Sequence, residues 1–211
     1  MTLIDEAASF AEQAHEATGQ QRKYTGEPYF IHPRRVALRL ENLLTPLLGT
    51  HELSWPYYEA IIAAAYLHDV VEDCNVSIST IKEKFGSIVA QHVAWLTSDK
   101  TAISYILTDK NINNYEAKGI YLAYKMNRMS LHTRLIKWAD REDNVRDLAN
   151  LPPEESDFAS NYAKETKYII EHLAFVPTPI EAILIASITG MLEPFSTDEL
   201  RTSDGSSVEM E

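Results

Sequence analysis

Apolar residues recur at helical spacing along almost the whole chain of 211 residues, and this periodicity restricts the possible folds more than any other feature. Alternation typical of strands is weak throughout. No internal repeat, long linker or glycine-rich phosphate loop interrupts the pattern. The sequence therefore predicts an all-α helical bundle in one domain over residues 1–194. The acidic tail at residues 195–211 has few apolar residues, and we expect it to be disordered.

The periodicity also predicts individual elements. We expect helices over residues 2–17, 33–46, 57–73, 78–86, 87–97, 116–129, 131–148, 154–174 and 179–192. Residues 98–115 are polar and poorly periodic, which predicts a loop. The segment EAIIAAAYL within residues 57–73 is apolar on all sides, so its helix should lie at the centre of the core. Pro33 suits a first helical turn and should hold the preceding residue extended, which predicts His32 at a helix entrance.

Charge and composition exclude several classes of protein. The 19 basic and 31 acidic residues give a net charge of −12, which argues against general nucleic-acid binding. The N-terminus lacks the pattern of a signal peptide, and no apolar run is long enough to span a membrane. Cys74 is the only cysteine, so no intrachain disulfide can form. Together these features predict a soluble cytoplasmic protein with no membrane contact.

Histidines and carboxylates occur at three separated places: His32 in YFIHP, His68-Asp69 in AAAYLHDVVED, and Asp140 in LIKWADREDN. Two imidazoles and two carboxylates suit Mn²⁺, Fe²⁺ or Zn²⁺. The apolar sequence before His68 and before Asp140 predicts that these groups are buried, and buried carboxylates need partners. The pattern predicts a metal site, although each motif alone is more often structural.

Helical spacing places further groups beside this site. Glu72 and Asp73 lie four residues after His68 and Asp69, so each pair shares a helix face. A carboxylate there can orient or deprotonate a water molecule, which makes both residues candidate catalytic groups. Adjacent residues on a regular helix point about 100° apart. His68 and Asp69 can therefore reach one ion only if it lies near a helix end or between their two directions.

A local group of cations could bind an anionic ligand despite the negative net charge. Its members are Arg22, Lys23, Arg34, Arg35, Lys137, Arg141 and Arg146. Lys137 and Asn144 share the helix face of Asp140, three residues before it and four after it. The remaining histidines have no carboxylate at useful spacing, and we expect a surface or capping role for His15.

Five segments in order resemble one family: GQQRKYTGEPYFIHP, AAYLHDVVED, FGSIVAQHVAWLT, LIKWADREDNVRDL and YAKETKYI. They are similar to the HD hydrolase domain of the RelA/SpoT homologues, including the stand-alone small alarmone hydrolases such as the metazoan SpoT homologues. The resemblance covers residues 3–190. It implies an all-helical HD domain that removes the 3′-pyrophosphate from guanosine 3′,5′-bispyrophosphate (ppGpp) or its pentaphosphate relative. GDP or GTP and pyrophosphate would be the products.

The resemblance also implies roles for residues. Mn²⁺ would be held by His32, His68, Asp69 and Asp140. Glu72 and Asp73 would activate the water. Substrate contacts would come from Arg22, Lys23, Lys137, Arg141 and Asn144.

The chain departs from the family pattern in a few positions. Glu142-Asp143 replaces the usual leucine-histidine, which adds two acids near a polyanion site unless they turn away. Tyr24 adds an aromatic to the loop that contacts the base in relatives. These departures leave the choice between a guanosine and an adenosine substrate open.

Other functions also remain open at this point. The chain ends where a synthetase or regulatory domain begins in longer relatives, so we expect a hydrolase-only role, either in alarmone turnover or as antitoxin to an alarmone synthetase. The alternatives are an HD phosphohydrolase of another nucleotide, such as NADPH, a dNTP or a nucleoside monophosphate, and a non-catalytic nucleotide-binding protein.

Overall fold

The computed structural model describes residues 1–23, 25–48 and 53–195, and these residues form only helices, turns and two isolated β-bridges. The α-helices are α1 Leu3–Thr18, α2 Ile31–Leu44, α3 Trp55–Leu67, α4 Val70–Asp73, α5 Ile78–Leu96, α6 Lys100–Lys110, α7 Asn114–Met126, α8 Leu131–Asp147, α9 Ser156–Glu171 and α10 Pro179–Leu192. Short 3₁₀ helices span Thr45–Leu47, Leu148–Asn150, Pro153–Glu155 and Glu193–Phe195. The predicted all-α class is confirmed. Tyr24 and all of the predicted tail except Phe195 lie outside the described residues.

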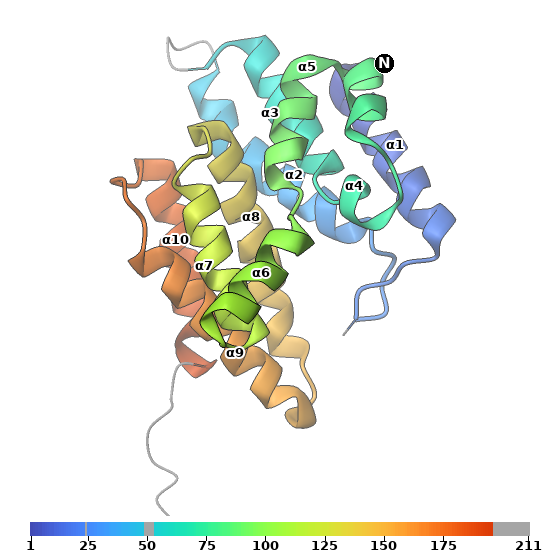
Figure 1. The fold of residues 1–211 in the computed structure, drawn as a ribbon. Coiled ribbons are helices and arrows are strands. Elements are labelled where there is room, and N and C mark those ends of the chain that lie inside the picture. The colour runs from blue at the N-terminus through green and yellow to red at the C-terminus, as the bar shows by residue number, and fades with distance from the viewer. Residues whose placement is uncertain (24, 49–52, 196–211) are drawn as a thin grey trace, which may run out of the picture.

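Helix α3 lies among the N-terminal helices in the upper part of Figure 1, and its burial agrees with its apolar sequence. Helices α1, α2, α5 and α8 all pack against it. Every residue from position 60 to position 68 is buried. Burial of a whole helix stabilises the fold by roughly 1.5–3 kcal/mol for each large apolar side chain. The C-terminal end of α3 is therefore held rigidly inside the molecule.

The single helix predicted over residues 57–73 is wrong, because α3 ends at Leu67 and α4 begins at Val70. The side chain of His68 explains the break. Its Nδ1 lies 2.8 Å from the carbonyl oxygen of Ala65. In an uninterrupted helix that carbonyl would accept the amide of Asp69. His68 and Asp69 keep right-handed helical backbone angles, and the pair lies at the end of α3, one of the two placements that let both reach one ion.

The loop predicted over residues 98–115 is also wrong, since α6 and the start of α7 occupy most of it. Asp99 caps α6 by accepting the amides of Thr101 and Ala102, and Asn111 ends it in the left-handed region. No residue of α6 is buried. Ala102, Ile103 and Ile106 are only partly buried against the core, and a face this short leaves a weak apolar period, which is why periodicity missed the helix.

Smaller differences occur at helix starts. His32 is the second residue of α2 and not extended, because Pro33 falls in the first turn, where its missing N–H is not needed. The helices predicted over residues 78–86 and 87–97 meet at Gly86, whose φ of 87° kinks α5. Ser77 caps α5 through the amide of Thr80, whereas Ser79 only contacts the Ser77 hydroxyl.

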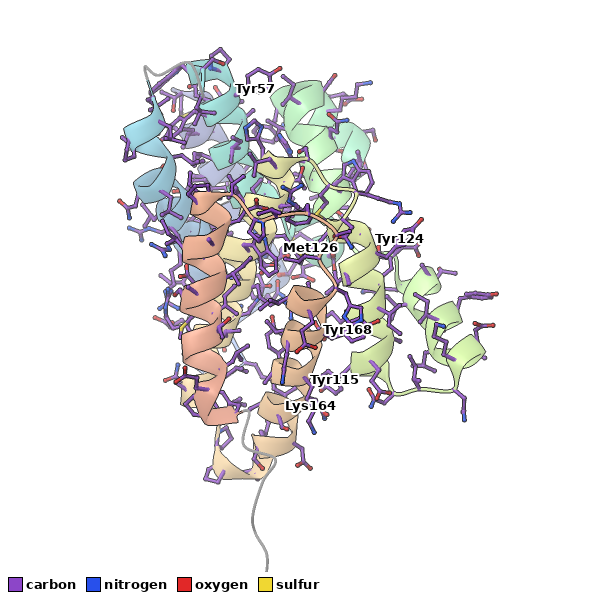
Figure 2. The ribbon with its side chains drawn as sticks, turned by 90° about the vertical axis from the view of Figure 1, so that its left-hand side faces the viewer. Tyr57, Tyr115, Tyr124, Met126, Lys164 and Tyr168 are labelled. Carbon is purple, nitrogen blue, oxygen red and sulfur yellow. The ribbon has the colours of Figure 1, made fainter. Side chains whose placement is uncertain are left out.

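The C-terminal half packs α7 against α9 and α8 against α10. Figure 2 shows Tyr115 and Tyr124 on α7, and Lys164 and Tyr168 on α9, where these two helices lie side by side. None of the helices in the described ranges combines the length and the apolar character needed to cross a bilayer.

Candidate active site

The three segments predicted to hold a metal meet at one point. His32 comes from α2, His68 and Asp69 from the junction of α3 and α4, and Asp140 from α8. The Nε2 atoms of His32 and His68 are 3.2 Å apart. Oδ1 of Asp140 lies 3.2 Å from His32 Nε2, and Oδ2 of Asp69 lies 3.1 Å from His68 Nε2. Ligand atoms of His32, His68 and Asp140 all lie within 4.8 Å of one another, and Oδ2 of Asp69 lies beside them, 3.6 Å from His32 Nε2.

The orientation of the two imidazoles fits a cation. Nδ1 of His68 faces the Ala65 carbonyl, and Nδ1 of His32 faces Oδ2 of Asp143 at 2.8 Å. Both Nδ1 atoms must act as donors toward these oxygens, so in the neutral rings both Nε2 atoms carry lone pairs. Two lone pairs and two carboxylate oxygens that face one another repel unless positive charge lies among them. This donor set fits a divalent metal ion.

The pKa directions agree with this reading. Burial disfavours protonated His68, but the neighbouring Asp69 and Asp140 carboxylates outweigh it and raise the pKa of His68 well above its usual value. Burial likewise opposes ionisation of Asp140, yet the Lys137 ammonium and the two histidines lower the pKa of Asp140 well below its usual range. The carboxylates are ionised, and the site attracts positive charge.

Asp140 is held from both sides along its own helix. Its Oδ2 accepts from Lys137 Nζ at 2.8 Å, and its Oδ1 accepts from Asn144 Nδ2 at 2.6 Å. These are the i−3 and i+4 neighbours predicted from the spacing. Their contacts fix the carboxylate so that Oδ1 faces the two histidines.

Glu72 and Asp73 lie on α4, beside the four potential ligands. The Glu72 carboxylate accepts the backbone amide of Ser98, and Oδ2 of Asp73 accepts from Gln20 Nε2 at 3.0 Å. Both line the same cavity as Asp69 and Asp140. Their position suits groups that handle a water molecule, and this role stays a prediction.

A cavity of about 440 Å³ is lined by two of the four predicted metal ligands, Asp69 and Asp140. All five predicted substrate contacts line it: the cations Arg22, Lys23, Lys137 and Arg141, and the amide Asn144. The other predicted cations, Arg34, Arg35 and Arg146, do not line it. The cavity is large enough for a nucleotide-sized ligand.

The comparison with known families places this site in context. The family model for the HD domain matches residues 7–175. The chain belongs to the HD domain family. The match includes all four potential metal ligands, and the resemblance to the RelA/SpoT homologues is confirmed by the relatives that follow.

Relatives of this HD domain include two long bacterial proteins. A Synechocystis protein named probable guanosine-3′,5′-bis(diphosphate) 3′-pyrophosphohydrolase is 36% identical over 172 residues, which are 82% of this chain and 20% of the relative. An Aquifex aeolicus protein named guanosine-3′,5′-bis(diphosphate) 3′-pyrophosphohydrolase is 36% identical over 171 residues, 81% of this chain and 21% of the relative. The chain thus spans about a fifth of their length.

A shorter relative and a solved structure match more evenly. The Xenopus tropicalis guanosine-3′,5′-bis(diphosphate) 3′-pyrophosphohydrolase MESH1 is 34% identical over 154 residues, 72% of this chain and 73% of the relative. A structure described as a metazoan ortholog of SpoT that hydrolyzes ppGpp superposes with a TM-score of 0.67 at 24% identity, covering 93% and 97% of the two chains. The fold of this HD domain is therefore that of the metazoan ortholog.

In this HD domain most cavity cations are already paired. Arg22 donates to Asp147 Oδ2 at 2.7 Å and to Asn144, and Lys23 lies 2.6 Å from a Glu155 oxygen. Arg141 lies 2.7 Å from Oε1 of Glu165 and above the ring of Tyr162. Arg22 and Arg141 are buried, so part of their charge is balanced within the protein.

Sequence reasoning missed several residues of the site. Tyr29 donates from its hydroxyl to Asp69 Oδ2 at 2.7 Å, and Lys118 of α7 lines the cavity wall. Among the described residues no carboxylate lies within ion-pair distance of Lys118. Asp143 and Asp147 lie three and seven residues after Asp140, on the same face of α8. That spacing was a readable signal for the two acids, whereas nothing local marked Lys118.

The two acids that replace the family's usual leucine-histidine turn away from the cavity. Glu142 accepts from Arg39 through both oxygens, at 2.7 and 3.0 Å. Asp143 contacts His32 and Arg146. Neither residue lines the cavity, so their charges do not face a bound polyanion.

The surface or capping role expected for His15 is wrong. His15 is buried, and its ring packs 4.8 Å from the ring of Tyr29 between centroids. Its Nδ1 lies 3.1 Å from Gln20 Oε1 and 3.2 Å from the Cys74 sulfur. Burial and the nearby Asp73 raise the pKa of the Cys74 thiol to about 11, which agrees with a structural cysteine. His15 thus contacts Tyr29 and Gln20, the residues that donate hydrogen bonds to Asp69 and Asp73.

Proposed function

We propose that this HD domain hydrolyses the 3′-pyrophosphate of ppGpp or its pentaphosphate relative, giving GDP or GTP and pyrophosphate. The observation that carries the proposal is the cluster of His32, His68 and Asp140, with Asp69 beside it, next to a cavity that is lined by Asp69, Asp140 and basic side chains. The relatives named as 3′-pyrophosphohydrolases of this nucleotide support the same substrate.

The proposed cofactor is Mn²⁺, held by His32, His68, Asp69 and Asp140. A mixed set of imidazole and carboxylate ligands suits this ion. A bound divalent metal would lower the pKa of a water molecule and neutralise charge on the phosphate oxygens.

Glu72 and Asp73 are proposed to orient the attacking water and take up its proton. The water oxygen bonds to the phosphorus next to the ribose, and the bond from that phosphorus to the 3′ oxygen breaks. The 3′ oxygen leaves as the hydroxyl of GDP after it receives a proton. Gln20 and the Ser98 amide hold the two carboxylates, so their geometry does not depend on the substrate.

The substrate contacts are proposed as follows. Lys137, Arg141 and Lys118 face the cavity from α8 and α7 and would meet phosphate oxygens. Arg22, Lys23 and Asn144 also line the cavity, and the planar guanidinium of Arg22 would stack on the purine. The rings of Phe158 and Tyr162 supply further apolar surface to the same cavity.

The decisive experiment measures pyrophosphate release from ppGpp by protein stripped with chelator and then given Mn²⁺. The adenosine analogue and a panel of NADPH, dNTPs and nucleoside monophosphates are run beside it. Mn²⁺-dependent release with GDP as the second product supports the proposal, and the rate ratio of the two bis(pyrophosphates) defines the base preference.

Two outcomes would contradict the proposal in different ways. Turnover of another nucleotide alone would keep the metal site and replace the substrate. Metal binding without turnover of any nucleotide would contradict the hydrolase proposal and favour the non-catalytic alternative. The His68→Ala variant, which removes a ligand atom from the centre of the site, controls for contaminating phosphatases in each assay.

A further inference from the structure

Asp143 contacts the imidazole ring of His32, whose other nitrogen faces the proposed metal position. It is 2% exposed, and its Oδ2 lies 2.8 Å from Nδ1 of His32. Its other oxygen accepts from Nη1 of Arg146 at 2.7 Å. With each carboxylate oxygen bound to a different donor, the carboxylate cannot rotate without losing a charge-assisted hydrogen bond.

The two histidines differ in what holds them. His68 donates from Nδ1 to the neutral backbone carbonyl of Ala65, whereas His32 donates to the ionic side chain of Asp143. A carboxylate acceptor fixes the tautomer and raises the basicity of the far ring nitrogen more than a carbonyl does. The contact with Asp143 therefore directs Nε2 of His32 toward Oδ1 of Asp140, 3.2 Å away, at the proposed metal position.

The neighbouring acid supplies a contrast within the same chain. Glu142 is also 2% exposed and also joins α8 to α2, through its two contacts with Arg39. It does not touch His32 in the part of the chain that the structure describes. If Asp143 only docked α2 on α8, the two acids would have equivalent roles.

We propose that Asp143 is a positioning residue that orients His32 as a metal ligand and raises the affinity of the site for a divalent cation. This inference rests on the proposed function, because it needs His32 to bind a metal.

The test compares Asp143→Asn, Asp143→Ala and Glu142→Gln with the unaltered protein. Mn²⁺ affinity is measured by isothermal titration calorimetry on chelator-stripped protein, and the urea unfolding midpoint of the stripped protein is measured in parallel. We expect Asp143→Asn to weaken Mn²⁺ binding about tenfold and Asp143→Ala by up to about 100-fold. Glu142→Gln should lower the unfolding midpoint but leave Mn²⁺ affinity within about twofold.

The outcomes separate this inference from the proposed function. If the unaltered protein binds no divalent metal, the proposed metal site fails and the inference fails with it. If the unaltered protein binds Mn²⁺ and the Asp143 variants bind it equally well, with only a lower unfolding midpoint, Asp143 is structural and the inference alone is overturned. Should Asp143→Ala not fold, the nearly isosteric Asp143→Asn decides the question.

Discussion

At the level of single residues, one set of groups surrounds the proposed metal position and another set lines the cavity. His32 and His68 have their ring nitrogens at the centre, while Glu72 and Asp73 line the cavity wall and bond to Ser98 and Gln20. This separation predicts that metal binding and catalysis can be lost independently.

The first prediction follows from that separation. His68→Ala removes one ligand atom and should abolish stoichiometric Mn²⁺. Asp73→Asn removes a charge outside the ligand set, so it should keep the metal and lose turnover by about 100-fold or more, the usual size of a general-base contribution. Metal analysis of both purified variants, with pyrophosphate release, checks this. Equal metal loss in both would show that Asp73 is a ligand and that the proposed roles are wrong.

The second prediction concerns Lys118, whose ammonium lines the cavity without a carboxylate partner among the described residues. Lys118→Ala should raise KM for ppGpp about tenfold and leave Mn²⁺ content unchanged, since a charged hydrogen bond contributes about 1.5–3 kcal/mol. Steady-state kinetics provide the measurement. Lys167→Ala is the matched control, because Lys167 is exposed on α9 and pairs only with Glu171. The same KM for both variants would exclude Lys118 as a substrate contact.

At the level of elements, two junctions shape the molecule. The break between α3 and α4 places His68 and Asp69 at a helix end, where both side chains can reach one ion. The kink in α5 depends on Gly86, whose φ of 87° and ψ of 169° are open essentially to glycine alone. The sequence predicted the junction at Gly86, whereas it predicted a single helix across the break between α3 and α4.

The third prediction tests the kink with a pair of substitutions. Gly86→Ala should lower the free energy of unfolding by about 1–3 kcal/mol, because alanine is strained at that φ even though no atom lies within 4 Å of the added Cβ. Gly190→Ala, at a helical and exposed position of α10, should raise it by about 0.5–1 kcal/mol. Urea denaturation of both variants checks the opposite signs. A neutral Gly86→Ala would mean that α5 can straighten at no cost.

At the level of the whole molecule, buried histidines link stability to pH. His92 on α5 is buried against Thr133 of α8, and burial with the nearby His132 lowers its pKa to about 4. The unfolded chain, with a pKa near 6.5, therefore binds the proton more readily than the folded protein. The contribution of His92 to stability is complete above pH 6.5 and declines as the pH falls toward 4.

The fourth prediction follows from that sign. This histidine should cost the native protein about 2 kcal/mol of stability between pH 7 and pH 5. His92→Gln retains a hydrogen-bonding side chain but cannot titrate, so its unfolding free energy should change less over that range. Urea midpoints at the two pH values give the comparison. An identical pH dependence in both proteins would place the acid sensitivity at other groups.

The fold and the identities of the potential metal ligands were readable from residue order. Helical periodicity marked nine of the helical segments, and the apolar run before His68 predicted its burial, because these are local properties of a chain with 3.6 residues per turn. Helix α6 was missed because its boundaries depend on caps and not on a buried face. The resemblance to the HD family supplied the order of the motifs, and the comparisons confirmed it.

Side-chain direction could not be read in the same way. The break after Leu67, the contact of Asp143 with His32, and the pairing of Arg22 with Asp147 all join residues that packing brings together. Residue type and spacing determine which helices form and which side chains carry chemistry. Whether a buried acid faces the cavity, a metal ligand or another helix depends on how α2, α3 and α8 are rotated against one another, and that rotation is set by the close packing of the whole core.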